Sequence, residues 1–324
     1  MSSEQSPAPS SGPVAAHHQK LSRSGLFYAF GAYGLWGLFP LFFLSLAPAS
    51  PFEIVGYRIV FSLLVCAVLL TFMKGWSRLW GLMKQPRVLI TMALAGILIY
   101  INWQVFIIAV VGNQVVESSL GYFINPIFTV ILGVTVLREK LRPMQWVAVG
   151  VSGIAVIVLT VSYGQLPWIA LALAGSFGIY GLIKKRVGGQ VDALSGLTLE
   201  TMWVFPIAIV QLFIVSNLVG LTFLGYGALH TILLVSTGIV TATPLLMFAA
   251  GARRLPLTAI GLIQYSTPVF TFILGVFVLH EAMPASRWAG VILIWIALII
   301  LTADMLRHQR GMRLARAAEN LTAT

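Results

Sequence analysis

The chain has 324 residues, of which 59% are apolar and only 9% are charged, whereas about a quarter of the residues in an ordinary soluble domain carry a charge. So few charged side chains cannot cover the surface of a soluble protein of this size. One helical span needs about 20 apolar residues, so the length suffices for about ten spans with short connections. The composition therefore excludes a sizeable soluble domain.

The net charge of +11 comes from 20 Lys and Arg residues that lie in small groups between apolar stretches. We assign this charge to the membrane surface rather than to nucleic-acid binding. Cys66 is the only cysteine, which excludes a disulfide within the chain, a CxxC redox pair and a thiolate metal site. We therefore expect a lipid bilayer and a small-molecule substrate as partners, with no nucleic acid, no metal and no cofactor.

Hydropathy predicts an all-α polytopic membrane protein with ten transmembrane helices. The apolar runs are continuous rather than alternating, and lipid cannot satisfy backbone polar groups, so the spans must be helices. The predicted spans are residues 25–46, 51–72, 88–110, 115–137, 144–162, 167–183, 193–215, 228–250, 257–279 and 288–305.

The distribution of Lys and Arg predicts the orientation of the chain. With the N-terminus in the cytoplasm, 18 of the 20 basic residues fall on the inner side, only Arg287 falls outside, and Arg58 lies within a span. This asymmetry is the positive-inside pattern. It predicts that both termini are cytoplasmic, residues 1–24 as a flexible tail and residues 306–324 as a basic tail.

Two segments of the chain show an internal duplication. Residues 126–139 read PIFTVILGVTVLRE and residues 268–281 read PVFTFILGVFVLHE, so ten of fourteen positions agree at an offset of 142. Near the start of each half, the pairs Gly34 and Gly175, and Gly37 and Gly178, correspond at an offset of 141. We infer two five-helix repeats, residues 25–162 and 163–305. Because five is odd, the second repeat is inverted in the membrane, and this geometry favours alternating access around a midplane cavity.

Several segments resemble a known family. They are NWQVFIIAV from Asn102, SSLGYFINP from Ser118, LRE at residues 137–139, SFGIYGLIKK from Ser176, GLTLE ending at Glu200 and GLIQYSTP from Gly261. They are similar to the RarD branch of the EamA-type drug/metabolite transporter superfamily, and the similarity extends over about residues 22–305. The resemblance implies a ten-helix permease of the bacterial inner membrane.

Two polar stripes are candidates for the lining of a substrate cavity. Ser118, Tyr122 and Asn125 are spaced so that they share one face of the fourth span, and Gln264 and Thr267 take the positions of Tyr122 and Asn125 in the ninth. Polar groups inside a membrane usually face the bundle interior or a water-filled cavity. The alternative is that these side chains form ordinary hydrogen bonds between helices.

Asn102, Trp103 and Gln104 interrupt the third span with two amides and one aromatic ring. We predict that they also line the cavity, with ordinary helix packing as the alternative.

Charged residues inside the spans are candidates for a gate or for ion coupling. Arg58 and Glu200 correspond at the offset of 142, and Glu117 matches Arg58 in depth. We predict a gate or a substrate anchor at Arg58 and Glu200, with Glu117 as the closest candidate partner of Arg58. If transport is coupled to protons, Glu200 could carry the proton. A structural ion pair or a snorkelling side chain is the alternative.

Polar residues at the helix ends are predicted to be structural. Ser50 and Asp192 correspond and are both good N-cap residues, and Glu53 would complete a capping box with Ser50. Glu139 and Glu281 end corresponding spans, where we expect them to bind loop amides or nearby basic groups.

Small residues form a further pattern. Gly31, Gly34 and Gly37 in the first span, and Gly175, Gly178 and Gly181 in the sixth, are each three residues apart. Such strips allow helices to approach closely, and the alternative is a surface along which a helix moves.

The inverted repeat and the polar stripes favour a secondary transporter of a small organic metabolite or drug-like solute. The sequence contains no GxxxxGK[ST] nucleotide loop, so ATP hydrolysis by this chain is not expected. A membrane scaffold or sensor is the alternative. An intramembrane enzyme is a further one, although no HExxH or GxSxG motif is present.

Overall fold

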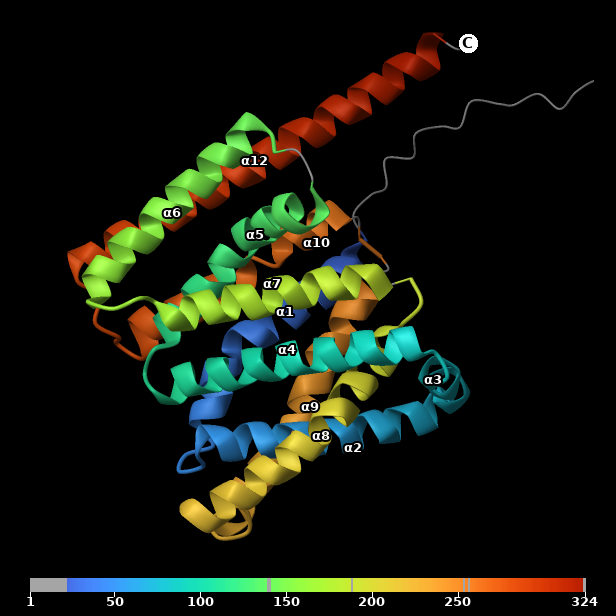
Figure 1. The fold of residues 1–324 in the computed structure, drawn as a ribbon, viewed down its shortest axis with the longest axis vertical. Coiled ribbons are helices and arrows are strands. Elements are labelled where there is room, and N and C mark those ends of the chain that lie inside the picture. Colours follow the sequence, from blue (N-terminus) through green and yellow to red (C-terminus); the bar gives the residue numbers. More distant parts are fainter. Residues whose placement is uncertain (1–21, 139–140, 188, 253, 256, 323–324) are drawn as a thin grey trace, which may run out of the picture.

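The computed structural model describes residues 22–138, 141–187, 189–252, 254–255 and 257–322, and the predicted N-terminal tail lies almost entirely outside them. Every regular element in the described part is helical (Figure 1). The first half contains α1 (Arg23–Leu44), α2 (Pro51–Phe72), α3 (Trp76–Met83), α4 (Pro86–Val111), α5 (Val115–Leu137) and α6 (Pro143–Tyr163). The second half contains α7 (Trp168–Val187), α8 (Ala193–Leu218), α9 (Gly227–Ala252), α10 (Leu257–Ile263), α11 (Ser266–Ile273), the π-helix η1 (Leu274–Val278) and α12 (Ala285–Thr322).

Eight of these helices are long and apolar enough to cross a membrane, and Trp168–Lys184 and Ser266–Val278 are shorter apolar helical stretches. Each of these ten segments coincides with one predicted span. The all-α polytopic fold class is therefore confirmed.

The ninth predicted span, residues 257–279, is not one continuous helix. It is broken between Ile263 and Ser266, and it ends in the π-helix η1. Pro268 lacks an N–H, and its ring clashes with the carbonyl four residues earlier, at Gln264. The corresponding helix α5 nevertheless continues through Pro126. A proline at corresponding positions thus accompanies a helix break in one repeat and a continuous helix in the other.

Two further elements differ from the prediction. The connection between the second and third spans contains α3, in which Leu79 and Leu82 are buried while Trp80 is 57% exposed. Helix α12 does not end near residue 305 but continues to Thr322, so the basic tail is helical as far as that residue. It lies alongside α6 and then extends beyond the other helices (Figure 1).

The contacts between the two halves follow the inverted repeat. Helix α5 packs on α7, and its counterpart α11 packs on α1, the counterpart of α7. Similarly, α4 contacts α7 and α8, whereas α9 contacts α1 and α2. Helices α2 and α8 contact each other, as do α6 and α12. Each of these contacts is the inverted image of another or of itself, as a pseudo-twofold axis requires.

Two glycine contacts show this symmetry at the level of single residues. A Cβ built on Gly37 would lie 2.6 Å from Cβ of Phe270, and a Cβ built on Gly178 would lie 2.7 Å from Cδ1 of Phe128. These glycines correspond to each other, and so do the two phenylalanines. Close packing is confirmed for this pair, whereas a Cβ at Gly181 would meet no atom within 4 Å.

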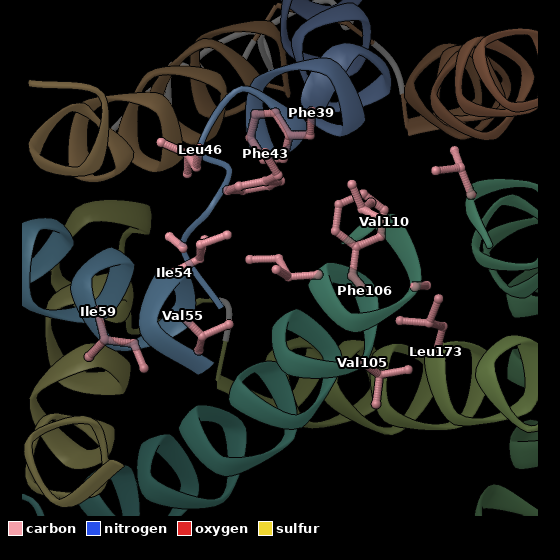
Figure 2. Close-up of a cluster of buried hydrophobic side chains, with 14 of the residues drawn as sticks. Phe39, Phe43, Leu46, Ile54, Val55, Ile59, Val105, Phe106, Val110 and Leu173 are labelled. Atoms are coloured by element: carbon pink, nitrogen blue, oxygen red, sulfur yellow. The ribbon is translucent and has the colours of Figure 1, made fainter. Parts of the chain in front are cut away.

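The largest buried apolar cluster joins both repeats. It contains side chains from α1, α2, α4 and α7, including Phe43, Ile54, Phe106 and Leu173 (Figure 2). Trp103 packs against this cluster and also against a second one built around Met92. The core therefore surrounds the polar residues that lie midway along α2 and α4.

The predicted N-caps are confirmed. Ser50 Oγ accepts a hydrogen bond from the Glu53 amide at 3.1 Å, and Asp192 Oδ1 accepts one from the Ser195 amide at 3.1 Å. The predicted capping box is wrong, because Glu53 Oε1 accepts from the amides of Thr222 and Phe223 at 2.7 and 3.1 Å. The loop before α9 needs this carboxylate for its own unsatisfied amides.

Candidate functional site

Asn102 is the centre of a buried hydrogen-bond network that joins three helices. Its Nδ2 donates to Ser176 Oγ at 3.0 Å and to the Leu173 carbonyl at 3.2 Å, and its Oδ1 accepts from the Tyr122 hydroxyl at 3.1 Å. The side chain is 2% exposed. Helices α4, α5 and α7 are therefore fixed to one another by a single amide whose polar atoms are satisfied.

The two residues that follow Asn102 point elsewhere. The ring of Trp103 lies against Arg58, while Gln104 Oε1 accepts from Gln211 Nε2 on α8 at 3.1 Å. The buried Nε2 of Gln104 has no partner. Successive residues of a helix face directions about 100° apart, so the three side chains contact different neighbours, and the lining of a cavity by them stays a prediction.

An apolar crevice of about 700 Å³ lies beside Gln211. Phe52, Ile207 and Leu218 line it and are all at least 40% exposed, so it is open at the surface of the protein. It lies on the outer surface of the bundle rather than between the polar stripes.

The first polar stripe is only partly directed at the network. Tyr122 donates to Asn102 and packs edge-on against Phe106 and Phe177. Ser118 Oγ donates to the Val115 carbonyl of its own helix at 2.7 Å. Asn125 Oδ1 is buried without a hydrogen-bond partner. Tyr122 and Asn125 thus remain candidates for a substrate contact, whereas Ser118 is occupied within α5.

The second stripe holds two helices together. Thr267 Oγ1 donates to the Tyr33 carbonyl of α1 at 2.7 Å, and Thr271 Oγ1 donates to the Gly37 carbonyl at 3.4 Å. Gln264 is half-buried at the break between α10 and α11. For Thr267 the structure shows the hydrogen bond between helices that was the alternative interpretation.

Arg58 lies in an aromatic environment. Its Cζ is 4.0 Å from the centroid of the Trp103 ring, 5.2 Å from that of Phe43 and 5.5 Å from that of Phe39. Its Nε donates to Thr241 Oγ1 on α9 at 3.0 Å. The side chain is only 3% exposed. The arrangement stabilises the cation by stacking on aromatic rings.

Glu200 is the charged counterpart of Arg58, but it has an ion-pair partner. Its Oε1 accepts from Lys184 Nζ at 2.7 Å, and its Oε2 accepts from the Tyr180 hydroxyl at 3.2 Å. Tyr180 and Lys184 come from α7, which packs against α4 and α5. The predicted alternative of a structural ion pair therefore applies to Glu200 in this conformation.

Glu117 does not pair with Arg58, contrary to the expectation from its depth. Its Oε1 accepts from the Ile169 amide at 3.2 Å, at the start of α7. Helix N-termini carry unsatisfied amides and a partial positive charge, and this attracts a carboxylate strongly.

Glu281 has a similar structural role. Its two carboxylate oxygens accept from the amides of Val115 and Val116 at 2.6 and 3.0 Å, at the start of α5. Burial raises the pKa of this carboxyl group, and the two amide bonds offset only part of the increase. The prediction that Glu281 binds loop amides is confirmed, whereas Glu139 lies outside the described residues.

Sequence patterns missed the residues that complete these sites. Thr241, Tyr180 and Lys184 bind Arg58 and Glu200. Thr241 is 183 residues from Arg58 in the sequence, whereas Tyr180 and Lys184 come from the helix directly before that of Glu200. In the sequence, Lys184 is one of the basic residues on the predicted inner side, with nothing that links it to Glu200. At the offset of 141, Tyr180 and Lys184 correspond to Phe39 and Phe43, but this correspondence alone does not indicate a contact with Glu200.

Ten candidate spans in two inverted repeats, with the Asn102–Tyr122 hydrogen-bond network and the separate buried Arg58 inside the bundle, define a polytopic α-helical membrane protein with a polar interior. Residues 23–161 and 166–303 each match the EamA-like transporter family. This chain belongs to that family, in its RarD branch.

Relatives of similar length support this assignment. The chain is 47% identical to Protein RarD of Streptomyces exfoliatus over 93% of this chain and 96% of the relative. It is 37% identical to Protein RarD of Escherichia coli K12 over 90% and 98%. It is 40% identical to the uncharacterized transporter YojE of Bacillus subtilis over 81% and 87%. A solved crystal structure of a protein with 20% identity, covering 87% of this chain and 98% of its own, superposes with a TM-score of 0.55 and shows the shared fold.

Proposed function

We propose that this protein is a secondary transporter that moves a small organic metabolite or drug-like solute by alternating access. The observation that carries the proposal is a difference between two symmetry-related helix contacts, which we call joints: α5 with α7, and α10 and α11 with α1. Helix α5 runs unbroken along α7, whereas its counterpart is divided into α10 and α11 beside α1. An inverted repeat whose halves adopt different conformations can exchange them, and the exchange opens the site to the other side of the membrane.

The substrate contacts that we propose lie between these joints. Tyr122, Asn125, Asn102 and Trp103 line the path from the first repeat, and Gln264 lies at the break in the second. Buried polar groups in a membrane are costly unless they are satisfied or used. The unpartnered Oδ1 of Asn125 supports its assignment to a substrate contact.

We further propose that the protein lies in a bacterial inner membrane with both termini in the cytoplasm. The support is the excess of Lys and Arg on one side of the spans. Single cysteines at Asn113 and Arg254, both in turns between helices, test this in intact cells after replacement of the buried Cys66. An impermeant thiol reagent should label position 113 only. Labelling of both positions from outside would contradict the inverted topology.

Transport itself is tested with purified protein in sealed lipid vesicles. Radiolabelled solutes are screened for uptake without ATP, and vesicles preloaded with the same unlabelled solute should accelerate uptake by exchange. Empty vesicles and the Asn125→Ala variant are the controls. Solute binding without any flux or exchange would favour a sensor over a transporter.

A further inference from the structure

Arg58 carries a buried positive charge for which the described residues supply no carboxylate. Its Nε is bound to the neutral hydroxyl of Thr241, and its two Nη groups have no hydrogen-bond partner among the described residues. A guanidinium cannot lose its proton to escape this situation. A buried charge without a counter-charge is destabilising, and in a membrane it marks a functional site.

The described acidic side chains are all engaged elsewhere. Three of them form ion pairs, and three accept hydrogen bonds from backbone amides at loops or helix ends. The ion pairs are Asp192 with Arg78, Asp304 with Arg142 and Glu200 with Lys184, and the amide acceptors are Glu53, Glu117 and Glu281.

The second repeat offers an internal comparison. Phe39 and Phe43 pack on Arg58 in the first repeat, and the residues at the corresponding positions, offset by 141, are Tyr180 and Lys184. Those two residues bind Glu200, the counterpart of Arg58. One repeat thus supplies the counter-charge of its buried ion, and the other has an aromatic ring in that place. The missing charge at Arg58 is therefore specific to this site and not a general property of the fold.

We propose that Arg58 binds the carboxylate of an organic acid that is the transported solute. This inference rests on the proposed transport function and names the class of its substrate. The two free Nη groups match the two oxygens of a carboxylate in a bidentate, charge-assisted pair. The Trp103 ring holds the guanidinium plane, and the surrounding Phe39 and Phe43 exclude water, which strengthens the ion pair.

The site is closed in this conformation, since Arg58 is 3% exposed. Binding therefore requires the opening that alternating access provides. The bound acid would neutralise the charge of Arg58 as Lys184 neutralises Glu200, so the loaded site can close again without an unpaired ion.

The test uses the full chain purified in detergent and pairs of probes that differ only in charge. The pairs are acetate and acetamide, benzoate and benzamide, and phenylacetate and phenylacetamide, with inorganic phosphate as a further anion, all at constant ionic strength. Melting temperature is measured as a function of concentration, because a ligand that binds only the folded state raises it. At least one carboxylate should stabilise the protein, and its amide should not.

The variants then assign the effect to Arg58. In Arg58→Gln the apparent dissociation constant for that carboxylate should increase by about tenfold or more, the loss expected for a charge-assisted hydrogen bond. The dissociation constant of Arg58→Lys should lie between those of the wild type and Arg58→Gln, because lysine keeps the charge but lacks the planar guanidinium group. The exposed Arg78 provides the matched control Arg78→Gln, which should respond like the wild type.

A second readout does not depend on the choice of probe. Without ligand, Arg58→Gln should melt at the same temperature as the wild type or higher, because the substitution removes an unpaired buried charge. An arginine with a buried counter-ion would give a clear decrease.

Several results would overturn the inference. They are equal responses to acid and amide, an unchanged response in Arg58→Gln, a response to phosphate alone, or no response to any carboxylate. Vesicle flux separates this inference from the transport proposal. If solute flux is the same in Arg58→Gln as in the wild type, the role of Arg58 is refuted and the transport proposal stands. If carboxylate binding depends on Arg58 but no solute crosses the membrane, the transport proposal is refuted and the binding role of Arg58 stands.

Discussion

Phe270 lies directly on the backbone of Gly37, where a Cβ would approach the phenylalanine Cβ to 2.6 Å. The contact joins α11 to α1, and the Thr267 hydroxyl reinforces it through the Tyr33 carbonyl. Its inverted counterpart is the contact between Phe128 and Gly178. The two joints are the places where the repeats exchange conformations in the proposed mechanism, so their close packing bears on both stability and transport.

Replacing Gly37 by alanine should destabilise the protein by about 1–3 kcal/mol, because the added methyl group overlaps a stiff part of Phe270. The matched control is Gly181→Ala, at a helical position where no atom lies within 4 Å. This control should stabilise the protein by up to about 1 kcal/mol through helix propensity. Reversible unfolding in mixed detergent measures both. Equal effects of the two substitutions would show that the close contact has no energetic weight.

Loss of the polar groups of Tyr122 or Asn125 should reduce transport while the protein still folds. Tyr122→Phe removes the donor to Asn102, and Asn125→Ala removes an acceptor that has no partner. Thr135→Ala is the control, since its hydroxyl donates only to the Ile131 carbonyl of its own helix, at 2.9 Å. Vesicle uptake and size-exclusion profiles are compared. Normal uptake by both Tyr122→Phe and Asn125→Ala would exclude the predicted cavity.

If transport is coupled to protons, Glu200 is the predicted carrier of the proton. Glu200→Gln keeps the size of the side chain and one acceptor oxygen, replaces the other oxygen by an amide donor, and cannot carry a proton. Uptake by this variant should no longer respond to a pH gradient across the vesicle membrane, although exchange of solute at equal pH continues. A gradient response that persists in Glu200→Gln would assign coupling to another residue.

Removing either member of the ion pair of Lys184 and Glu200 should destabilise the protein, but by different amounts. Lys184→Gln leaves a carboxylate that is 2% exposed without its counter-charge, a change of the kind that costs about 3–5 kcal/mol. Glu200→Gln should cost less, because the Lys184 side chain is 28% exposed and can turn toward water. Unfolding of both variants and of the double variant gives the coupling energy. A larger loss in Glu200→Gln would contradict this order.

The cap of α8 makes stability depend on pH. Burial acts to raise the pKa of Asp192, but hydrogen bonds from Ser195 and Arg78 outweigh it, so the pKa lies below the ordinary value of 3.8. The resulting stabilisation is complete above that value and is lost as the pH falls below it. Asp192→Asn should keep the cap and lose this dependence, whereas Asp192→Ala should cost about 1 kcal/mol at neutral pH and less at acidic pH, where the wild type has itself lost the charged cap.

The corresponding cap in the first repeat provides the control for this measurement. Ser50 has a hydroxyl in place of a carboxylate, so Ser50→Ala should cost a similar free energy of unfolding with no change between neutral and acidic pH. Unfolding curves of the four proteins at several pH values make the comparison. If the free energy of unfolding changes with pH in the same way in the wild type and in Asp192→Asn, Asp192 is not the source of the pH dependence.

The sequence by itself determined the fold class, the ten spans and the pairing of residues such as Ser50 and Asp192. These follow from the requirement that lipid imposes on the backbone and from a duplication at an offset of 142 residues, or 141 in the first helices of the repeats. The structure confirms the caps at both residues. Helix caps and apolar spans depend on residues that are neighbours in the chain, so the sequence pattern alone can predict them.

Only the tertiary structure decided which side chains meet. In the sequence, Arg58 and Glu200 are equivalent candidates for a gate or a substrate anchor. In the structure, Arg58 stacks on the Trp103 ring, whereas Glu200 forms an ion pair with Lys184. The tertiary structure also decided that the ninth span breaks at Gln264 while α5 does not break at its own proline. Contacts across a bundle depend on the rotation and depth of each helix, and a difference of one residue turns a side chain by about 100°.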